Sequence, residues 1–339
     1  MGRRLPYCRV VADGNPLLEL ETVPTDLVRV EEALRAAVRS EDPYLTEVAS
    51  HLILAGGKRG RPAFAVGAAA TALATMDAVP QDAIQGGVSV ELVHLGSLYH
   101  DDVMDEATTR RTVESVNARW GNLQAILAGD FLLAKASEIA ASLGTEVAGL
   151  LAATIGRLCE GQVLELQHTY NETRTEDAYL RSIEGKTASL FATASRIGAL
   201  TTGQARERVD ALTEFGLAYG MAFQIVDDIL DIIATDEQLG KPAGHDLIEG
   251  VYTLPVIRTL AAGNDALGGM LGSPLTLDEM AVARSIVRDG GEIASSMQTA
   301  LDYVRRAEAA LEPLGESEAR DGLAGAAQHL LTSVTAIAG

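Results

Sequence analysis

The chain has 339 residues, of which 47% are hydrophobic and only 4% aromatic, and its formal net charge is −20. Nucleic acids are bound by basic surfaces, so this charge excludes a nucleic-acid partner. Two cysteines, Cys8 and Cys159, exclude a disulfide-stapled scaffold and favour a reducing, cytoplasmic location.

The N-terminal 18 residues have the composition of a loose tail. Met1 to Arg4 is basic, but polar residues follow too soon for the apolar region of a signal peptide. No linker interrupts the pattern from Leu27 to about Leu260, and the loop at residues 261–273 is interpreted as a helix connection, so we expect one domain over residues 19–339. The longest uncharged runs are too short or too polar to span a membrane, so we expect no membrane span.

Apolar residues recur at spacings of three and four, as at Leu27, Val30, Leu34 and Val38, and again from residue 301 to residue 311. This spacing is typical of helices, whereas the alternation expected of strands is missing. Glycine and proline divide the chain at residues 56–57, 79–80, 143–144, 239–242, 272–274 and 313. The pattern predicts an all-α fold, a single bundle of roughly ten or more helices.

Two aspartate clusters lie inside apolar runs and are the most informative feature. They are Asp101, Asp102 and Asp105, and Asp227, Asp228 and Asp231. Residues three or four apart share a helix face, so each cluster can present two carboxylates to one ion. Solvated acidic surface is the alternative, but the apolar flanks of both clusters disfavour it. Because Mg²⁺ prefers a few carboxylates together with substrate phosphates, the clusters predict a phosphorylated ligand between them.

Lysine is rare, occurring only at positions 58, 135, 186 and 241. Lys58, Lys186 and Lys241 each follow a glycine, and we expect them in loops where backbone can approach an anion. Ordinary loop lysines are the alternative interpretation. Arg110 and Arg111 follow the first cluster and are expected a little over one helical turn beyond it.

Seven motifs in a fixed order cover residues 56–255. They are GGKRGRP, ELVHLGSLYHDDVMDEATTRR, AILAGD, GQVLE, GKTASLF, FQIVDDILD and LGKPAGHDLIEGVYTLP. Together they resemble the trans-isoprenyl diphosphate synthases, the polyprenyl synthetase family. The resemblance implies the isoprenoid synthase fold, an all-helical bundle around a central apolar cavity that is usually a homodimer. It also implies a prenyltransferase that joins an allylic diphosphate to isopentenyl diphosphate.

The resemblance also implies roles for individual residues. Two or three Mg²⁺ ions would be held by Asp101, Asp105 and Asp227, with Asp102, Asp228 and Asp231 completing the clusters. Arg110, Lys186 and Lys241 would neutralise the allylic diphosphate, and Thr187 and Gln224 would face the reacting carbon. Isopentenyl diphosphate would be held by Lys58, Arg61, His94 and Arg111. A peripheral membrane contact would serve product release.

Four positions depart from the family pattern. Glu165 replaces a frequent Asp, Thr112 a common Gly, Glu114 a common Pro, and Gly250 a Lys of short-chain members. These departures indicate a longer-chain member. The tunnel-floor positions, Gly96 and Ser97, are also small, which predicts a product longer than about fifteen carbons and of about thirty or more, since each helical turn of ~5.4 Å admits about one isoprene unit.

The sequence leaves three alternative classes of protein. Glu91 with His94 and Glu165 with His168 each form Glu-x-x-His, the pattern of di-iron carboxylate bundles. A terpene cyclase also ionises a prenyl diphosphate, but it lacks the pocket that GGKRGR indicates. A non-catalytic subunit of a heteromeric synthase tends to lose its aspartates, whereas both clusters are present here.

Overall fold

The computed structural model describes residues 14–73, 77–239 and 243–338 and confirms the all-α prediction. Within these residues the strands are a two-residue pair, β1 (Thr109–Arg110) and β2 (Val113–Glu114). The helices are α2 Pro16–Glu19, α3 Val23–Ala37, α4 Pro43–Leu54, α5 Gly60–Ala70, α6 Gln81–Met104, α7 Val116–Trp120, α8 Asn122–Ser142, α9 Thr145–Leu166, α10 Glu176–Ile183, the π-helical turn η1 Glu184–Ala188, α11 Ser189–Thr201, α12 Arg206–Ile233, α13 Asp236–Leu239, α14 His245–Ile248, α15 Leu254–Ala261, α16 Asp265–Gly268, α17 Leu277–Asp289, α18 Glu292–Ala310, the 3₁₀ turn η2 Glu312–Leu314 and α19 Glu318–Ala338.

Local sequence explains where several helices begin. Asp42 accepts a hydrogen bond from the first turn of α4, and Thr175 does the same for α10. Thr276 and Glu279 form a reciprocal capping box at the start of α17. Each cap satisfies backbone N–H groups that have no partner within the helix. The periodic segments 27–38 and 301–311 lie mainly in α3 and α18, as predicted.

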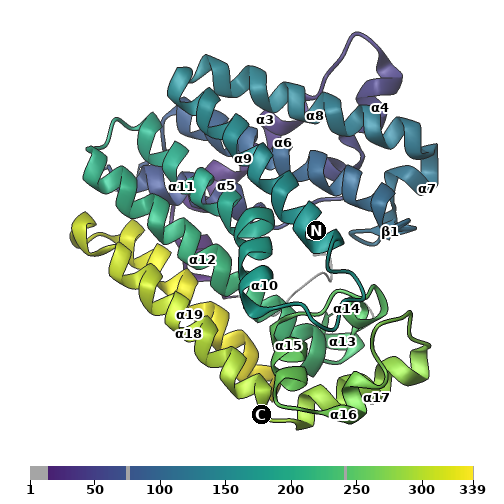
Figure 1. Cartoon of the computed structure of the whole chain (residues 1–339). Coiled ribbons are helices and arrows are strands. Elements are labelled where there is room, and N and C mark those ends of the chain that lie inside the picture. Colours follow the sequence, from purple (N-terminus) through teal and green to yellow (C-terminus); the bar gives the residue numbers. More distant parts are fainter. Residues whose placement is uncertain (1–13, 74–76, 240–242, 339) are drawn as a thin grey trace.

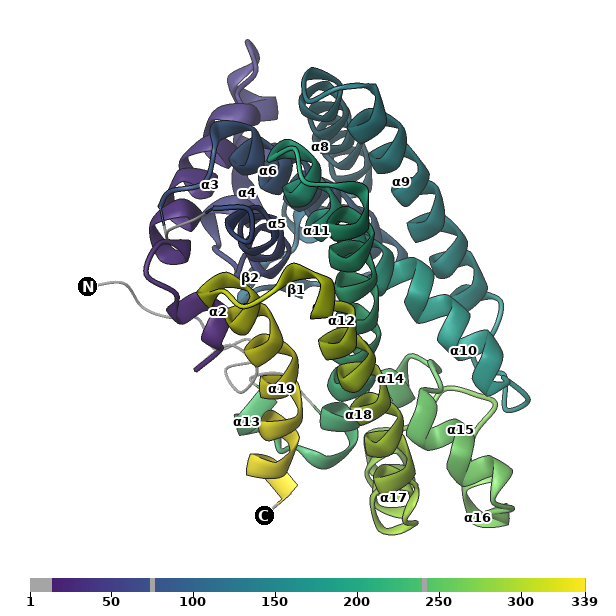
Figure 2. The same cartoon turned by 90° about the vertical axis from the view of Figure 1, so that its left-hand side faces the viewer.

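Helices α5, α6, α11 and α12 form the centre of the bundle (Figure 1). Helix α11 packs against α5, α6 and α12, and α8 covers α6 from outside. Figure 2 shows α8 and α9 at one edge of the molecule, and Figure 1 shows α18 with α19 along another. Helices α13 to α17 lie beyond the C-terminal end of α12 (Figure 1).

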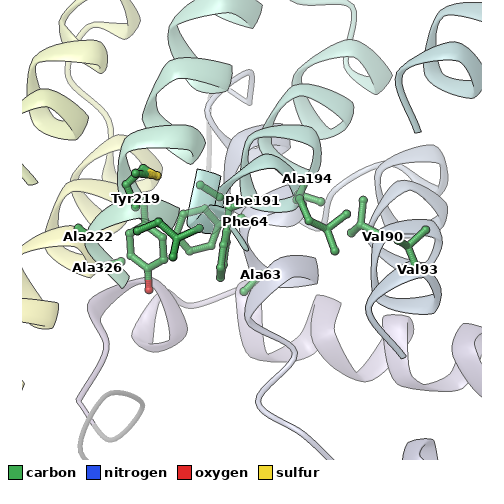
Figure 3. Close-up of a cluster of buried hydrophobic side chains, with 14 of the residues drawn as sticks. Ala63, Phe64, Val90, Val93, Phe191, Ala194, Tyr219, Ala222 and Ala326 are labelled. Atoms are coloured by element: carbon green, nitrogen blue, oxygen red, sulfur yellow. The ribbon is translucent and has the colours of Figure 1, made fainter. Parts of the chain in front are cut away.

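An aromatic cluster holds the central helices together (Figure 3). The Phe64 ring of α5 lies 4.3 Å from that of Tyr219 on α12 and 5.2 Å from that of Phe191 on α11, measured between centroids. All three side chains are at least 97% buried. Burying such a side chain contributes about 1.5–3 kcal/mol. The cluster therefore fixes α5, α11 and α12 relative to one another beneath the polar site.

Ordered packing begins before the expected boundary at residue 19. Residues 1–13 lie outside the described part of the chain. Asn15 caps α2, and the Leu17 side chain is only 1% exposed. Helix α2 packs against α19, which joins the two ends of the described chain. Residues 15–18 are thus part of the fold, because Leu17 supplies apolar burial that a loose tail would lack.

The two arginines after the first cluster do not continue its helix as expected. Helix α6 ends at Met104, and Glu106 takes a positive φ of 50°, which a helix cannot accommodate. Arg110 then lies in β1, while Arg111 and Thr112 form the hairpin loop with φ of 53° and 65°. A two-residue loop with both φ positive usually contains glycine. This explains why a glycine is common at the position of Thr112.

Candidate active site

The first aspartate cluster lies at the C-terminal end of α6. Asp102 is fully buried, and its Oδ1 accepts a 2.6 Å hydrogen bond from Arg110 Nε, whereas its Oδ2 has no hydrogen-bond partner among the described residues. Burial raises the pKa of Asp101 and Asp102. Burial, reinforced by the Glu249 carboxylate, raises the pKa of Asp105 to about 6. Asp102 is therefore poorly hydrated, which favours binding of a cation, whereas Asp105 is exposed.

The second cluster lies in the last two turns of α12. Asp228 is 3% exposed and accepts hydrogen bonds from Tyr179 Oη at 2.6 Å and Gln224 Nε2 at 2.8 Å. Burial raises its pKa to about 7, although both hydrogen bonds oppose this shift. Asp231 is 2% exposed and accepts from the backbone N–H of Asp246 at 3.3 Å. Asp227 is half-buried.

An ion pair stands between the two clusters. Lys186 Nζ lies 2.5 Å from Glu165 Oε1. The Glu165 carboxylate acts on the pKa of both Asp101 and Asp228, so α6, α9 and α12 converge here. Burial works to lower the pKa of Lys186, but Glu165 and Asp101 outweigh it and the pKa is raised. The lysine therefore stays charged, and Glu165, whose longer side chain departs from the family pattern, holds it.

Lys186 lies in the π-helical turn η1 and not in the expected loop. This turn interrupts an otherwise continuous helix formed by α10 and α11. A Cβ added to Gly161 of α9 would lie 2.4 Å from the Lys186 backbone nitrogen, and one added to Gly185 would lie 2.7 Å from the Arg157 carbonyl oxygen. Two glycines thus allow α9 and the π turn to touch backbone to backbone. π turns of this kind are frequent at functional sites.

A hydrogen-bonded chain lines the site beside this ion pair. Thr187 Oγ1 donates to Gln224 Oε1 at 2.8 Å, and Gln224 donates in turn to Asp228. A cavity of ≈110 Å³ opens here, lined by Glu165, Arg174, Tyr179, Ile183, Lys186, Thr187, Gln224, Asp228, Asp246, Glu249, Val251 and Thr253. Most of these side chains are polar, which differs from the apolar cavity expected. The difference arises because this cavity lies at the charged end of the site.

A separate group of basic residues lies where the loop after α4 meets helix α5, helix α6 and the hairpin. We call this group, which includes Arg61, His94 and Arg111, the basic pocket. Arg111 donates to the carbonyls of Leu52, at 3.0 Å, and Gly56. Arg61 lies over the Phe191 ring, 4.8 Å from its centroid, and burial lowers its pKa to about 10. Burial, then Arg61 and Arg111, lower the pKa of His94 well below its usual value, so His94 is neutral at pH 7.

The predicted residues therefore divide into two groups. Arg61, His94 and Arg111 form the basic group. Lys58 is exposed on the loop before α5 that bonds to Arg111, and its charge acts on the pKa of His329 in α19. Lys241 lies outside the described residues, and no structural role is assigned to it. The remaining predicted residues lie around the acidic clusters.

Sequence reasoning missed two residues that organise the basic pocket. Glu91 is 1% exposed and accepts from Arg59 Nη1 at 3.0 Å, while Arg111 Nη2 lies 3.9 Å from the same oxygen. Arg59 is itself buried and also pairs with Glu31 at 2.8 Å. The available signal was a glutamate inside an otherwise apolar stretch of α6, since such a residue needs a cation partner.

The di-iron alternative does not fit this geometry. Glu91 pairs with arginine and Glu165 with lysine, and His168 Nδ1 contacts the Leu164 carbonyl oxygen at 2.8 Å. Across the described part of the chain, no three Asp, Glu, His or Cys side chains already converge as a metal site. A magnesium site assembled with substrate phosphates needs only one or two carboxylates, and the buried, partnerless Oδ2 of Asp102 fits such a site.

Comparison with known proteins agrees with this geometry. A family model described as polyprenyl synthetase matches residues 42–282. A nonaprenyl diphosphate synthase of Mycobacterium tuberculosis is 38% identical, covering 89% of this chain and 90% of the relative. A heptaprenyl diphosphate synthase component 2 of Geobacillus stearothermophilus is 40% identical, covering 87% and 92%. A crystal structure of polyprenyl synthase from Caulobacter crescentus, complexed with calcium and isoprenyl diphosphate, superposes with a TM-score of 0.87 at 31% identity over 98% and 99% of the two chains.

The fold and the paired acidic and basic sites thus define a helical prenyltransferase that handles diphosphates. The chain belongs to the polyprenyl synthetase family and is a polyprenyl diphosphate synthase. Members of this family use divalent metal ions. The di-iron and terpene-cyclase alternatives find no support in these matches.

Proposed function

We propose that the protein condenses an allylic diphosphate with isopentenyl diphosphate and releases an all-trans polyprenyl diphosphate. The observation that carries this proposal is the position of the β1–β2 hairpin. Arg110 binds Asp102 in the acidic site, while its neighbour Arg111 lies in the basic pocket with Arg61. One hairpin therefore joins two anion sites, as a reaction between two diphosphates requires.

The acidic site would bind the allylic diphosphate. Two or three Mg²⁺ ions, held by Asp101, Asp105 and Asp227, would neutralise charge on the leaving diphosphate. Lys186 and Arg110 add fixed positive charge, and Lys241 belongs to this group by its motif. Thr187 and Gln224 are locked together by their hydrogen bond, so their oxygen dipoles can stabilise positive charge on the reacting carbon without reorganising.

The basic pocket would hold isopentenyl diphosphate. Lys58, Arg61 and Arg111 supply charge, and neutral His94 can donate one hydrogen bond without adding to the repulsion among the arginines. Glu91 fixes two of the surrounding guanidiniums by pairing with them. The double bond of isopentenyl diphosphate attacks the allylic cation and forms the new carbon–carbon bond. The resulting cation then loses a proton, which the departed diphosphate can accept.

Product length depends on the wall of α6 below Asp101. Ser97 lies one helical turn below Asp101 on nearly the same face. Gly96 does not line that wall, because a Cβ there would lie 3.1 Å from the Gly129 carbonyl oxygen and 3.2 Å from Leu133 Cγ of α8. Ser97 alone therefore carries the prediction of a product longer than about fifteen carbons. The relatives named nonaprenyl and heptaprenyl diphosphate synthase support a long product.

The protein would act as a homodimer through the outer faces of α8 and α9. Leu123, Ile126 and Leu127 of α8 are 73%, 40% and 65% exposed, and Val163 and Leu166 of α9 are 52% and 50% exposed. Both helices lie at one edge of the molecule (Figure 2). By length and composition α9 could also span a membrane, and only 22% of its most apolar stretch is buried. A second copy of this surface would cover these apolar side chains.

We also propose a domain organisation, a location and a membrane contact for the protein. We place the chain from residue 15 onward in a single catalytic domain, in the cytoplasm, with a peripheral membrane contact that receives the product. The heptaprenyl relative is named as one component of a synthase. Activity of the purified chain alone would show that no second subunit is required here.

Incubation of the purified protein with Mg²⁺, farnesyl diphosphate and labelled isopentenyl diphosphate tests the proposal. We expect labelled prenyl diphosphates longer than the starter, and chromatography of the dephosphorylated products gives their length. Label that stays in isopentenyl diphosphate would contradict the proposed reaction. Products that stop at the starter plus one unit, at about twenty carbons, would contradict only the expectation of about thirty carbons or more.

A further inference from the structure

Arg174 is a buried cation that lines the cavity, and the proposed reaction assigns it no role. It lies in the connection between α9 and α10, directly before the residue that caps α10. Its side chain is only 4% exposed and lines the ≈110 Å³ cavity together with Lys186 and Thr187. A charge held this deeply loses most of its hydration, so it needs a partner that restores the lost interactions.

The described residues satisfy only part of this guanidinium. Nη1 donates to the carbonyl oxygen of Tyr252 at 3.0 Å, and the carbon Cζ lies 5.5 Å from the centroid of the Tyr179 ring. Nε and Nη2 have no hydrogen-bond partner anywhere in the described part of the chain. Buried donors are almost always paired in native proteins, so two unpaired donors on one cation indicate a missing acceptor.

The position of Arg174 is fixed rather than accidental. Tyr170, four residues earlier, donates two hydrogen bonds to the end of α14 and the loop after it, from its N–H to the Gly250 carbonyl at 2.8 Å and from its hydroxyl to the Ile248 carbonyl at 3.1 Å. The Tyr252 carbonyl then holds Nη1. The guanidinium is therefore anchored at one nitrogen while the other two remain available.

The lining of the cavity suits a phosphate group that arrives with metal ions. The cavity of ≈110 Å³ is lined mainly by polar and charged side chains, which favours a phosphate group over a prenyl chain. The carboxylates that act on Arg174 are those of Glu165, Asp228 and Asp246. Glu165 is paired with Lys186, and Asp228 with Tyr179 and Gln224. Arg174 and Lys186 are the cations that face this acidic cavity, and the metal ions that accompany a diphosphate would offset its remaining negative charge.

We propose that Arg174 is a further substrate-binding residue, whose Nε and Nη2 atoms bind a phosphate group of the allylic diphosphate and of the diphosphate released from it. The proposal rests on the proposed function of the acidic site. It adds a planar cation opposite the ammonium of Lys186. A guanidinium can bind two phosphate oxygens at once, which an ammonium does not do.

The variant Arg174→Gln tests this assignment, with Arg181→Gln as the matched control. Arg181 lies on α10 with a side chain that is 65% exposed and pairs with Asp177 at the surface. We expect Arg174→Gln to weaken binding of inorganic pyrophosphate, titrated calorimetrically with Mg²⁺, by about tenfold or more. The KM for farnesyl diphosphate should rise similarly, while the KM for isopentenyl diphosphate changes less than about twofold. Arg174→Lys should restore part of the loss.

Two further results separate the explanations. Unchanged pyrophosphate affinity in an Arg174→Gln variant with wild-type melting temperature would reduce Arg174 to an anchor for the Tyr252 carbonyl. If the variant does not fold, a wild-type crystal soaked with Mg²⁺ and pyrophosphate decides, because a phosphate oxygen within hydrogen-bond distance of Nε or Nη2 supports the proposal and a distant one overturns it. Absence of prenyl transfer by the wild type would overturn the proposed reaction, whereas the pyrophosphate titration still tests Arg174.

Discussion

At the scale of single residues, the site is organised by how buried charges are compensated. Asp102 pairs with Arg110, Glu165 with Lys186, and Glu91 with Arg59. Breaking a buried pair leaves an uncompensated charge that costs more than the pair contributes. These residues therefore fix the positions of cations before substrate arrives, which reduces reorganisation during the reaction.

Replacing Asp227 with Ala should remove one carboxylate of the metal site. We expect kcat/KM to fall by about 100-fold or more, corresponding to about 3 kcal/mol or more of lost transition-state stabilisation. The reason is that the negative charge on the leaving diphosphate would be less well neutralised by metal. Steady-state kinetics at saturating Mg²⁺ measures this. Asp302→Ala, at an exposed position of α18, is the control. Near-normal rates for Asp227→Ala would remove it from the metal site.

Magnesium binding should depend on pH because two of the carboxylates have raised pKa values, about 6 for Asp105 and about 7 for Asp228. Both are protonated more readily than in the unfolded chain, and protons compete with the metal. We expect Mg²⁺ affinity, measured with pyrophosphate present, to weaken as pH falls from 8 to 6. Affinity that stays constant over this range would contradict the assignment.

The raised pKa values of Asp105 and Asp228 also affect the metal-free protein, whose free energy of unfolding they increase at low pH. Between about pH 4 and pH 7 the native state binds more protons at these two groups than the unfolded chain does. Their contribution to the free energy of unfolding is therefore greatest at low pH and is lost as pH rises through 6 to 7. The Mg²⁺-induced rise in melting temperature should accordingly be larger at pH 8 than at pH 6.

At the scale of elements, departures from regular helix position the functional groups. The π turn η1 brings Lys186 against α9, and the β1–β2 hairpin divides Arg110 and Arg111 between two sites. The glycine before Lys186 suggested a loop, and continuation of the helix would have placed both arginines on α6. Local backbone irregularity is therefore concentrated at the functional site, as is common where chemistry constrains the chain.

Helix α6 should also set the length of the product. Ser97→Phe places a large ring one turn below Asp101, so we expect shorter products at a similar rate of first condensation. Chromatography of dephosphorylated products measures the change. Val282→Phe, at an exposed position of α17 outside the proposed dimer surface, is a size-matched control. An unchanged product distribution in Ser97→Phe would show that another wall stops elongation.

At the scale of the whole molecule, the exposed apolar side chains of α8 and α9 predict that the protein forms a homodimer. Leu127→Glu should shift the protein from dimer to monomer, because it places a charge in the centre of the buried surface. Sedimentation velocity measures the mass, and Leu277→Glu, on the exposed face of α17, is the control. A monomeric wild type would contradict the homodimer itself. A dimer that survives Leu127→Glu would place its interface elsewhere.

The sequence by itself determined the helical class, the two aspartate clusters and the family, because periodicity and motif order are local properties of the chain. It predicted the residues around both anion sites, with Lys241 outside the described residues. Only the tertiary structure revealed how Glu91, Arg59, Tyr179 and Arg174 contribute. Their partners lie on other segments of the chain, up to about eighty residues away as in the Arg174–Tyr252 contact, and a buried charge acquires its role only when folding removes water from it.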